Sequence, residues 1–249
     1  MHPHAETLWR GPRWTLAILL AVLGMLGPFS IDTYLPAFSG IASSLNASPV
    51  HMQQTLSAYL FGFAFMNLFH GALADSFGRR PVILWGLMAF TLASLGCALA
   101  QNVTQLIVFR AMQGLSCGAG VVVSRAIVRD IFPPTQAQKV MSQITIFFGL
   151  APAIAPIMGG WLFVSLGWHS IFWLLTAIGL ALWAVNFKML PESLHASQRQ
   201  PFSIPHLMRG YWQLCTDPRF LLLALASGIP FNGMFLYVLS APAFLGELL

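Results

Sequence analysis

Long apolar runs, separated by short polar segments, dominate the hydropathy pattern of the chain. We predict seven such runs, at residues 14–36, 53–74, 82–100, 104–125, 138–165, 169–190 and 219–241. A helix of about 20 apolar residues crosses the hydrocarbon core of a bilayer, and the runs have about this length. They do not alternate apolar and polar residues as the strands of a membrane barrel do. The pattern therefore predicts an all-α polytopic membrane protein.

The composition excludes an ordinary soluble domain. Hydrophobic residues make up 57% of the chain and charged residues only 8%, with a mean hydropathy of +0.74, whereas soluble domains carry charge on roughly a quarter of their residues. Arg10 and Arg13 precede the first apolar run, as basic residues do in an export signal. That run is too long for a signal and does not end in a small-residue cleavage site. We therefore interpret it as the first span.

The basic residues predict the orientation of the spans. The loops near residues 37–52, 101–103 and 166–168 contain no Lys or Arg, and only Arg110 falls inside a span. The positive-inside rule then places the N-terminus in the cytoplasm. The isoelectric point near 9.6 follows from this topology and not from nucleic-acid binding. The other basic residues lie at the predicted cytoplasmic side: Arg10, Arg13, Arg79, Arg80, Arg125, Arg129, Lys139, Lys188, Arg199, Arg209 and Arg219.

Loop lengths divide the chain into four parts. We predict a cytoplasmic tail at 1–13, a six-helix transmembrane domain at 14–190, a cytoplasmic linker at 191–217, and the first helix of an incomplete second domain at 218–249. The central part of the linker has the pattern of an amphipathic helix that lies on the membrane surface. A seventh helix without partners is an unusual end for such a domain, and it indicates truncation of a longer product.

Asp32 is the only acidic residue well inside a predicted span. An ionisable side chain in a bilayer is costly unless it is paired or faces water, so it suggests a functional site. With a rise of 1.5 Å per residue, Asp32 lies roughly 6 Å from the outer end of its span, and Arg110 roughly 9 Å from the outer end of its own. Two interpretations remain open. Asp32 caps its helix or neutralises Arg110, or it exchanges protons under the influence of Arg110.

Polar and small residues occur at helical spacing in the second and fourth spans. Gly114 and Gly118 form a small-xxx-small pattern, which indicates close helix packing. Gln113 lies near the face of Arg110, where it points into a cavity with Arg110 or is structural. A stripe in the second span either packs against neighbouring helices or contacts cargo. It consists of Tyr59, Phe63, Asn67 and His70.

The fifth span contains two prolines among glycines. Pro152 and Pro156 each remove one helical hydrogen bond, and Gly149 and Gly160 share their face. Gly159 is adjacent to this face. The pattern predicts a kinked helix that packs closely against its neighbours, which structural need explains without a role in cargo binding.

No catalytic or metal-binding pattern is present in the sequence. Cys97, Cys117 and Cys215 have no paired spacing, which favours packing roles. The seven His are scattered without ligand spacing. There is no nucleophile elbow, phosphate loop or catalytic carboxylate pair. We therefore expect no enzyme activity, no metal and no cofactor.

The segment from Gly71 to Leu84 concentrates charge between two apolar runs. It contains Asp75, Arg79 and Arg80 together with Gly78. Residues 71–80 resemble the signature between the second and third helices of the major facilitator superfamily. Further matches to this family occur in the expected order at Asp32, Tyr34, Leu35, Pro36, Arg110, Gln113, Gly114, Ala155, Pro156, Gly159, Gly160, Leu190, Pro191, Glu192 and Ser193.

Within the family, the motifs resemble those of drug:proton antiporters of the bicyclomycin and chloramphenicol resistance type. The resemblance implies twelve helices in two six-helix halves, each half built from two inverted three-helix repeats; this chain would supply the first half and a seventh helix. It implies a monomer in the bacterial inner membrane that exchanges small, largely apolar cargo for protons by alternating access. A facilitator or symporter of another solute and a non-transporting fragment remain as alternatives.

The resemblance also assigns roles to residues. It implies proton coupling at Asp32 and Arg110. The other implied roles are cargo binding by Tyr34, Tyr59, Asn67 and Gln113, gating by Gly71, Asp75, Gly78, Arg79 and Arg80, and the antiporter motif of helix five at Pro152, Pro156, Gly159 and Gly160. In this interpretation Asp75 pairs with the arginines and, when the inside is closed, engages a helix N-terminus of the second half.

Overall fold

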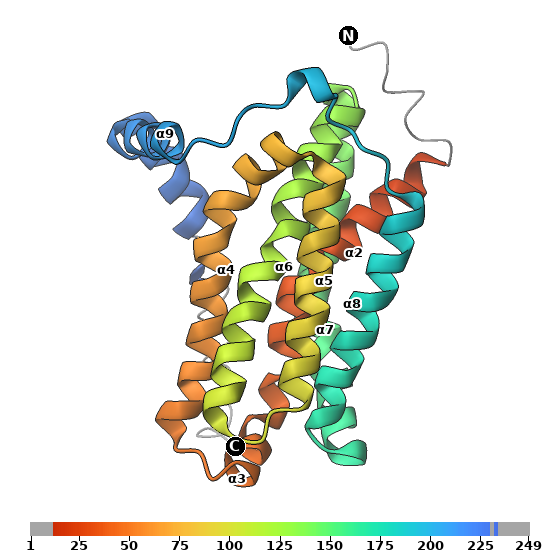
Figure 1. The fold of residues 1–249 in the computed structure, drawn as a ribbon, viewed down its shortest axis with the longest axis vertical. Coiled ribbons are helices and arrows are strands. Elements are labelled where there is room, and N and C mark those ends of the chain that lie inside the picture. Colours follow the sequence, from red (N-terminus) through yellow and green to blue (C-terminus); the bar gives the residue numbers. More distant parts are fainter. Residues whose placement is uncertain (1–11, 230–231, 234–249) are drawn as a thin grey trace. The chain divides into compact units, whose positions relative to one another are not determined.

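The computed structural model describes residues 12–229 and 232–233, and these residues are almost entirely helical (Figure 1). Six helices in them are long and apolar enough to cross a membrane. The helices and short 3₁₀ segments are, in order, α2 (Arg13–Asp32), η1 (Leu35–Ala37), α3 (Phe38–Ser44), α4 (Pro49–Phe77), α5 (Arg79–Ala98), α6 (Val103–Ile131), α7 (Pro134–Leu166), α8 (His169–Met189), η2 (Ala196–Gln198) and α9 (Ile204–Thr216).

The first six predicted spans are confirmed as helices, and their ends differ from the predicted ones. The first helix stops at Asp32, and η1 and α3 continue the chain to Ser44. α6 extends to Ile131, six residues past the predicted end at residue 125. A shorter apolar helix, Pro218–Ile229, occupies the start of the predicted seventh span. The remainder of that span lies largely outside the described residues.

Local sequence explains where several helices begin and end. Gly78 separates α4 from α5 with φ of +104°, and Gly167 separates α7 from α8 with φ of +81°. Glycine adopts these positive φ values without the steric cost that other residues incur. The amide of Gln105 donates to the side chain of Asn102, which caps the start of α6 at 2.9 Å. The two glycines thus permit the sharp reversals between successive spans.

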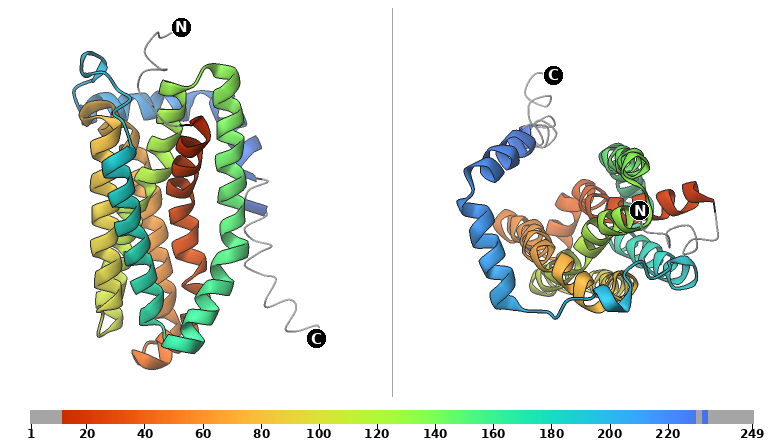
Figure 2. Two further views of the ribbon diagram at one scale, coloured as in Figure 1. Left: turned by 90° about the vertical axis from the view of Figure 1, so that its right-hand side faces the viewer. Right: turned by 90° about the horizontal axis from the view of Figure 1, so that it is seen from above.

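Glycines also allow the helices to pack closely around α6. A Cβ atom on Gly114 would overlap the carbonyl oxygen of Tyr59 in α4, and one on Gly120 would overlap the carbonyl oxygen of Leu23 in α2. One on Gly86 of α5 would lie 2.7 Å from the Cβ of Ala119. The predicted packing role of Gly114 is therefore confirmed. Because α2, α4 and α5 all contact it, α6 is central in the unit (Figure 2).

The chain divides into two compact units, and the first ends at Pro201. The first unit therefore includes residues 191–201, where we predict the start of a linker. These residues stay with the bundle because they bond to it: the amide of Gln200, for example, donates to the carbonyl oxygen of Asp75 at 3.2 Å. The second unit contains α9, which confirms a helix in the central part of the predicted linker.

Candidate functional site

Arg110 of α6 lies inside the six-helix unit. It has no exposed surface. Its guanidinium carbon lies 4.6 Å from the ring centroid of Tyr34 and 4.2 Å from that of Tyr59. An aromatic face stabilises a desolvated cation by about 2 kcal/mol or more. The two rings, from the segment after α2 and from α4, therefore hold the charge between them.

Neutral oxygen atoms complete the surroundings of this guanidinium. Its Nη1 donates to Oε1 of Gln113 at 2.7 Å and to the carbonyl oxygen of Ser30 at 3.3 Å. Nε2 of Gln113 donates in turn to Oγ of Ser94 at 2.8 Å. Nε and Nη2 of Arg110 are buried without a hydrogen-bond partner. We refer to the following residues as the Arg110 cluster: Ser30, Tyr34, Tyr59, Ser94, Arg110 and Gln113.

The cluster is closed in this structure. Tyr34, Tyr59 and Gln113 are fully buried, as Arg110 is. The expectation that Gln113 points with Arg110 into a cavity is therefore wrong here, because neither side chain reaches a surface. Contact of these residues with cargo stays a prediction, and it requires the surrounding helices to separate.

Asp32 lies on the opposite side of α2 from the Arg110 cluster. The hydroxyl of Ser30, two residues earlier, is 2.7 Å from the hydroxyl of Tyr59 in this cluster, and two residues correspond to a rotation of about 200° around a helix. One turn earlier, Pro28 and Phe29 are buried, whereas the side chain of Asp32 itself is half-buried.

No ion pair joins Asp32 to Arg110 within residues 12–229 and 232–233. The same range contains no hydrogen-bond partner for the Asp32 carboxylate. The interpretation of the two residues as a structural pair is therefore wrong. Their similar depth in the membrane is compatible with large separation because depth does not fix the direction in which each side chain points.

Two glycines of α7 lie beside the end of α2. A Cβ on Gly159 would overlap the backbone of Thr33, the residue after Asp32, and one on Gly160 would contact Cβ of Pro36 at 3.8 Å. Nothing lies within 4 Å of the corresponding position on Gly149. Close packing is thus confirmed at Gly159, next to the unpaired acid, and not at Gly149.

The prolines of α7 lie within a single helix. Pro152 and Pro156 are both inside α7, which continues from Pro134 to Leu166. Ala151 and Ala155 are fully buried, whereas the two prolines are half-buried. The kink that we predict at the prolines stays a prediction.

The polar stripe of α4 faces α6. The Oδ1 atom of Asn67 and the Nδ1 atom of His70 lie beside Gly118, where a Cβ would overlap the first and come within 3.2 Å of the second. Both atoms are buried without a hydrogen-bond partner. Gly118 therefore provides the space for these two polar side chains, which is a packing role; cargo binding by Asn67 stays a prediction.

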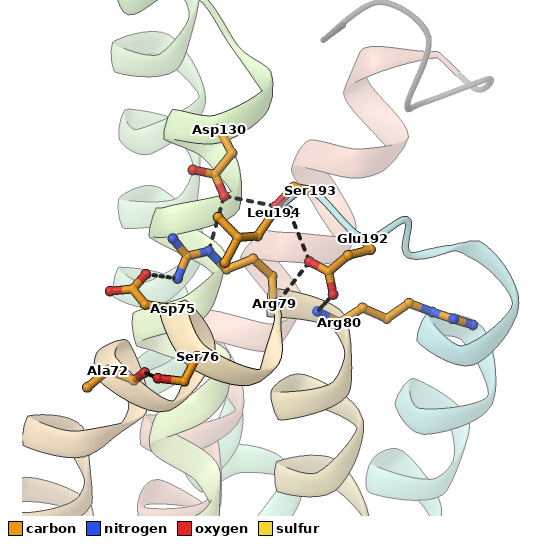
Figure 3. Close-up of polar contacts among 9 residues, drawn as sticks. All are labelled: Ala72, Asp75, Ser76, Arg79, Arg80, Asp130, Glu192, Ser193 and Leu194. Carbon is orange, nitrogen blue, oxygen red and sulfur yellow. Dashed lines mark hydrogen bonds and ion pairs between the residues drawn. The ribbon is translucent and has the colours of Figure 1, made fainter. Parts of the chain in front are cut away.

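A charged network surrounds Arg79 where α4 meets α5 (Figure 3). Nη1 of Arg79 lies 2.5 Å from Oδ1 of Asp75, one turn earlier, and its Nε lies 3.1 Å from Oδ2 of Asp130 at the end of α6. The hydroxyl of Ser193 donates to the same Oδ2 at 2.9 Å. The predicted pairing of Asp75 with an arginine is confirmed. The guanidinium joins the ends of α4 and α6.

Glu192 caps α5 from a distant part of the chain. Its Oε1 accepts the amide of Arg79 at 2.9 Å and its Oε2 accepts the amide of Arg80 at 3.2 Å (Figure 3). The first amides of a helix have no partner within it and attract negative charge. Glu192 thus fixes the segment after α8 to the start of α5. We refer to Asp75, Arg79, Asp130, Glu192 and Ser193 as the Arg79 network.

The other predicted gating residues have separate contacts. Nη2 of Arg80 donates to the carbonyl oxygen of Phe187 in α8 at 2.6 Å. The space around Gly71 is not crowded, because the nearest atom to a Cβ there would be 3.8 Å away, on Val122. Gly78 supplies the reversal between the two helices.

Sequence reasoning missed several members of both groups. It did not assign Asp130 to the network, or Ser30 and Ser94 to the Arg110 cluster. Glu192 was noted only as part of a family motif. A signal for Asp130 exists in the sequence: it is an acid next to Arg129 at the end of a long apolar helix, in the same predicted cytoplasmic layer as Arg79. The serines have no comparable signal.

Comparisons with known proteins identify relatives of this chain. The sequence model of the Major Facilitator Superfamily matches residues 11–249. The chain is 38% identical over 221 residues to a bicyclomycin resistance protein homolog of Haemophilus influenzae, an alignment that covers 89% of this chain and 56% of the relative. It is 39% identical over 232 residues to YdgK of Bacillus subtilis, an uncharacterized MFS-type transporter, with coverage of 92% and 58%.

A third relative and two solved structures agree with these matches. The multidrug resistance protein MdtL of Escherichia coli is 36% identical over 175 residues, which are 70% of this chain and 45% of MdtL. The human organic anion transporter MFSD10 (TETRAN) has a TM-score of 0.61 at 22% identity, covering 80% of this chain and 53% of that one. A bacterial homolog of the human lysosomal transporter Spinster, inward-facing and unoccupied, has a TM-score of 0.63 at 15% identity, covering 86% and 49%. The chain thus spans about half the length of the proteins that it matches.

Proposed function

The chain belongs to the Major Facilitator Superfamily, a family of transporters, and we propose that it takes part in proton-coupled efflux of small, largely apolar drugs or metabolites. Two of the relatives are named for bicyclomycin resistance and multidrug resistance, which supports export of drugs. The chain spans 56% to 58% of the length of two relatives. The proposal therefore concerns the whole transporter, in which these residues form one half of the alternating-access unit.

The position of Asp32 carries this proposal. Its carboxylate is half-buried in an apolar helix, and the described residues offer it neither an ion pair nor a hydrogen bond. A carboxylate in such surroundings is stabilised when it binds a proton or reaches water. The side chain of Asp32 is half-buried and not fully enclosed. These features suit a group that binds and releases protons during transport.

Coupling follows if cargo and proton favour opposite states. Loss of the proton from Asp32 would favour binding of cargo, and protonation would favour its release. Proton flow into the cell through repeated cycles then drives cargo outward. Arg110 contributes a positive charge that no carboxylate in the described residues neutralises, and we propose that its field assists this exchange. Because the two groups do not touch, this effect acts across the width of α2.

Efflux measurements test the proposal directly. We expect Asp32→Asn, expressed from the complete open reading frame, to lose at least about 10-fold of proton-driven efflux of bicyclomycin or chloramphenicol in inverted vesicles, since Asn cannot exchange a proton. Asp217→Asn is the matched control because Asp217 is an exposed acid at the start of another helix. Undiminished proton-driven efflux by Asp32→Asn would contradict the proposal. A facilitator would show downhill flux without any proton movement.

Orientation in the bacterial inner membrane is part of the proposal. The excess of Lys and Arg at one end of the bundle supports a cytoplasmic N-terminus. In a Cys215→Ser background, which removes the exposed cysteine, we expect a membrane-impermeant maleimide to label Gln101→Cys in spheroplasts. It should label Thr135→Cys only after permeabilisation. Both side chains are exposed: Gln101 lies just before α6, and Thr135 lies in the first turn of α7, which begins soon after α6 ends. The reverse pattern would invert the orientation.

A further inference from the structure

The second compact unit of the described chain contains α9, a helix with two distinct sides. Successive residues of a helix are rotated by about 100°, so the large apolar residues of α9 fall within one sector of about 160°. We refer to this sector as the apolar side of α9, and it contains Ile204, Leu207, Met208, Trp212, Leu214 and Cys215. The opposite side contains His206, Arg209 and Gln213. α9 is therefore strongly amphipathic.

The described chain leaves most of the apolar side of α9 uncovered. Ile204, Met208 and Leu214 are 54%, 42% and 42% exposed, and Trp212 is 72% exposed. No side chain of α9 is buried among the described residues. Apolar side chains that gather on one exposed face mark a surface that contacts a partner or a membrane. The apolar side of α9 therefore requires a cover, and its place in the chain indicates which one.

The chain holds one end of α9 at the membrane. Asp217 alone separates α9 from the apolar helix Pro218–Ile229, which begins the predicted seventh span. Consecutive Cα atoms are about 3.8 Å apart, so Thr216 lies within about 8 Å of Pro218. A helix that enters the bilayer starts in the headgroup layer, and the last turn of α9 therefore lies at that layer. At this depth lipid surrounds a chain unless another part of the protein displaces it.

The break at Asp217 allows α9 and the following helix to take different directions. Asp217 has an extended backbone, with φ of −84° and ψ of 111°, and Pro218 disfavours a helical conformation at the residue before it. The two helices meet at an angle there (Figure 2). With 13 residues, α9 is about 20 Å long, shorter than the hydrocarbon core of about 30 Å. It therefore suits a position along the membrane surface and not across the membrane.

We propose that α9 lies in the surface of the leaflet where the following helix starts, with its apolar side among the lipid chains. Helices of this kind keep a polar side in water while the apolar side enters the boundary between headgroups and acyl chains. Trp212 lies at the edge of the apolar side, where its indole ring reaches the headgroup level that Trp prefers. Arg209 lies on the side that faces water. The bilayer thereby holds the linker at its surface, and this role does not depend on the proposed proton coupling.

The depth of spin labels on α9 tests this position in the full chain. The protein from the complete open reading frame is labelled in detergent with a thiol-reactive nitroxide and reconstituted into vesicles of phosphatidylethanolamine and phosphatidylglycerol. Cys215 is exposed and lies on the apolar side, whereas Cys97 and Cys117 are buried. The Cys215→Ser variant reports any labelling elsewhere. Electron paramagnetic resonance then compares collisions of the label with oxygen, which concentrates in lipid, and with a nickel chelate, which stays in water.

The two sides of α9 should give opposite results. We expect the label at Cys215 to lie about 5–10 Å inside the headgroup boundary, the depth typical of interfacial helices, and to collide with oxygen more than with the nickel chelate. Met208→Cys in the Cys215→Ser background should give the same depth. Gln213→Cys in that background carries its label on the exposed polar side, where the nickel chelate should reach it.

Two variants place the same charge on opposite sides of α9. Met208→Glu puts a carboxylate on the apolar side and should move the Cys215 label into water, because a charge in the lipid region is costly. Gln213→Glu puts the carboxylate on the polar side and should leave the depth of that label unchanged.

Three results would overturn the proposal. The first is free access of the nickel chelate to Cys215 in the unmodified chain, which would show that water covers the apolar side. The second is an immobile label at Cys215 that neither reagent reaches, which would show that protein covers it. The third is equal depth of the labels at residues 208 and 213.

Discussion

Two arginines of this chain are buried by opposite means. Arg79, 7% exposed, contacts the carboxylates of Asp75 and Asp130, and Glu192 caps its helix. Arg110, fully buried in the middle of the bundle, contacts two tyrosine rings and neutral oxygens. The first charge is neutralised near the end of the bundle, where water is close. The second is not neutralised by any carboxylate of the described residues.

The difference decides how much each arginine contributes to the stability of the unit. Opposite charges that join the ends of α4, α5, α6 and the segment after α8 stabilise the arrangement of those helices. A buried cation without an acid adds little stability, because its desolvation offsets its contacts. We therefore infer that the Arg79 network holds the unit together, whereas the role of the Arg110 charge in transport stays a proposal.

Removal of Arg79 should cause the largest loss of stability. Arg79→Gln leaves the carboxylates of Asp75 and Asp130 facing each other without a cation. Since their side chains are 50% and 24% exposed, we expect a loss of about 1–3 kcal/mol, between the values for exposed and buried pairs. Thermal unfolding in detergent, followed by circular dichroism, measures it. Arg79→Lys, which reaches one carboxylate and not both, should lose about half as much; no loss in either variant would contradict a structural role.

Removal of the Glu192 charge should have a smaller effect. Glu192→Gln keeps one acceptor oxygen but loses the negative charge at the start of α5. We expect a loss of about 1 kcal/mol, typical of helix caps and charges at helix ends. Asp217→Asn gives the value for an exposed cap, because its carboxylate accepts the amide of Arg219 at 2.9 Å. No change in the unfolding free energy of Glu192→Gln would show that the Glu192 cap does not stabilise the unit.

Arg110→Met should change stability by less than about 1 kcal/mol, in either direction, because replacement of a buried charge by an apolar side chain of similar length is often neutral. The same unfolding measurement applies. In this variant Gln113 loses one hydrogen bond. A double variant in which Gln113 is also replaced by Met separates the effect of that lost hydrogen bond from the effect of the lost charge. A loss as large as that of Arg79→Gln would erase the distinction between the two arginines.

The smallest expected effect is the coupling between Asp32 and Arg110. Because no contact joins them, the changes in unfolding free energy of Asp32→Asn and Arg110→Met should add within about 0.5 kcal/mol in the double variant. Asp75 with Arg79 serves as the positive control, since that pair is in contact. A coupling above about 1 kcal/mol would show that Asp32 and Arg110 interact directly.

The spans could be predicted because the bilayer imposes them. Every backbone amide in the hydrocarbon must bond within its own helix, so apolar length predicts a helix. The helix ends were harder to predict, because a helix can continue beyond the bilayer, where the apolar run stops. α6, for example, passes Arg125 and Arg129 before it ends at Ile131. The break after Asp32 had no strong signal either.

The contacts of the charged residues were predictable only in part. Asp75 and Arg79 are four residues apart on the chain, so their contact is local. The depth of Asp32 and Arg110 follows from their positions in the spans, but the rotation of each helix about its axis depends on packing, which turned Ser30 toward Arg110 and Asp32 away. Glu192 reaches α5 from more than a hundred residues away, which no local pattern indicates.

Proton release on cargo binding tests the role of Asp32 most directly. The protein from the complete open reading frame, in weakly buffered detergent solution, is mixed with saturating bicyclomycin or chloramphenicol while a pH indicator reports the solution. We expect release of about one proton per chain and none from Asp32→Asn, provided that both bind cargo. Equal release from Asp32→Asn, or binding by the unmodified protein without any release, would contradict it.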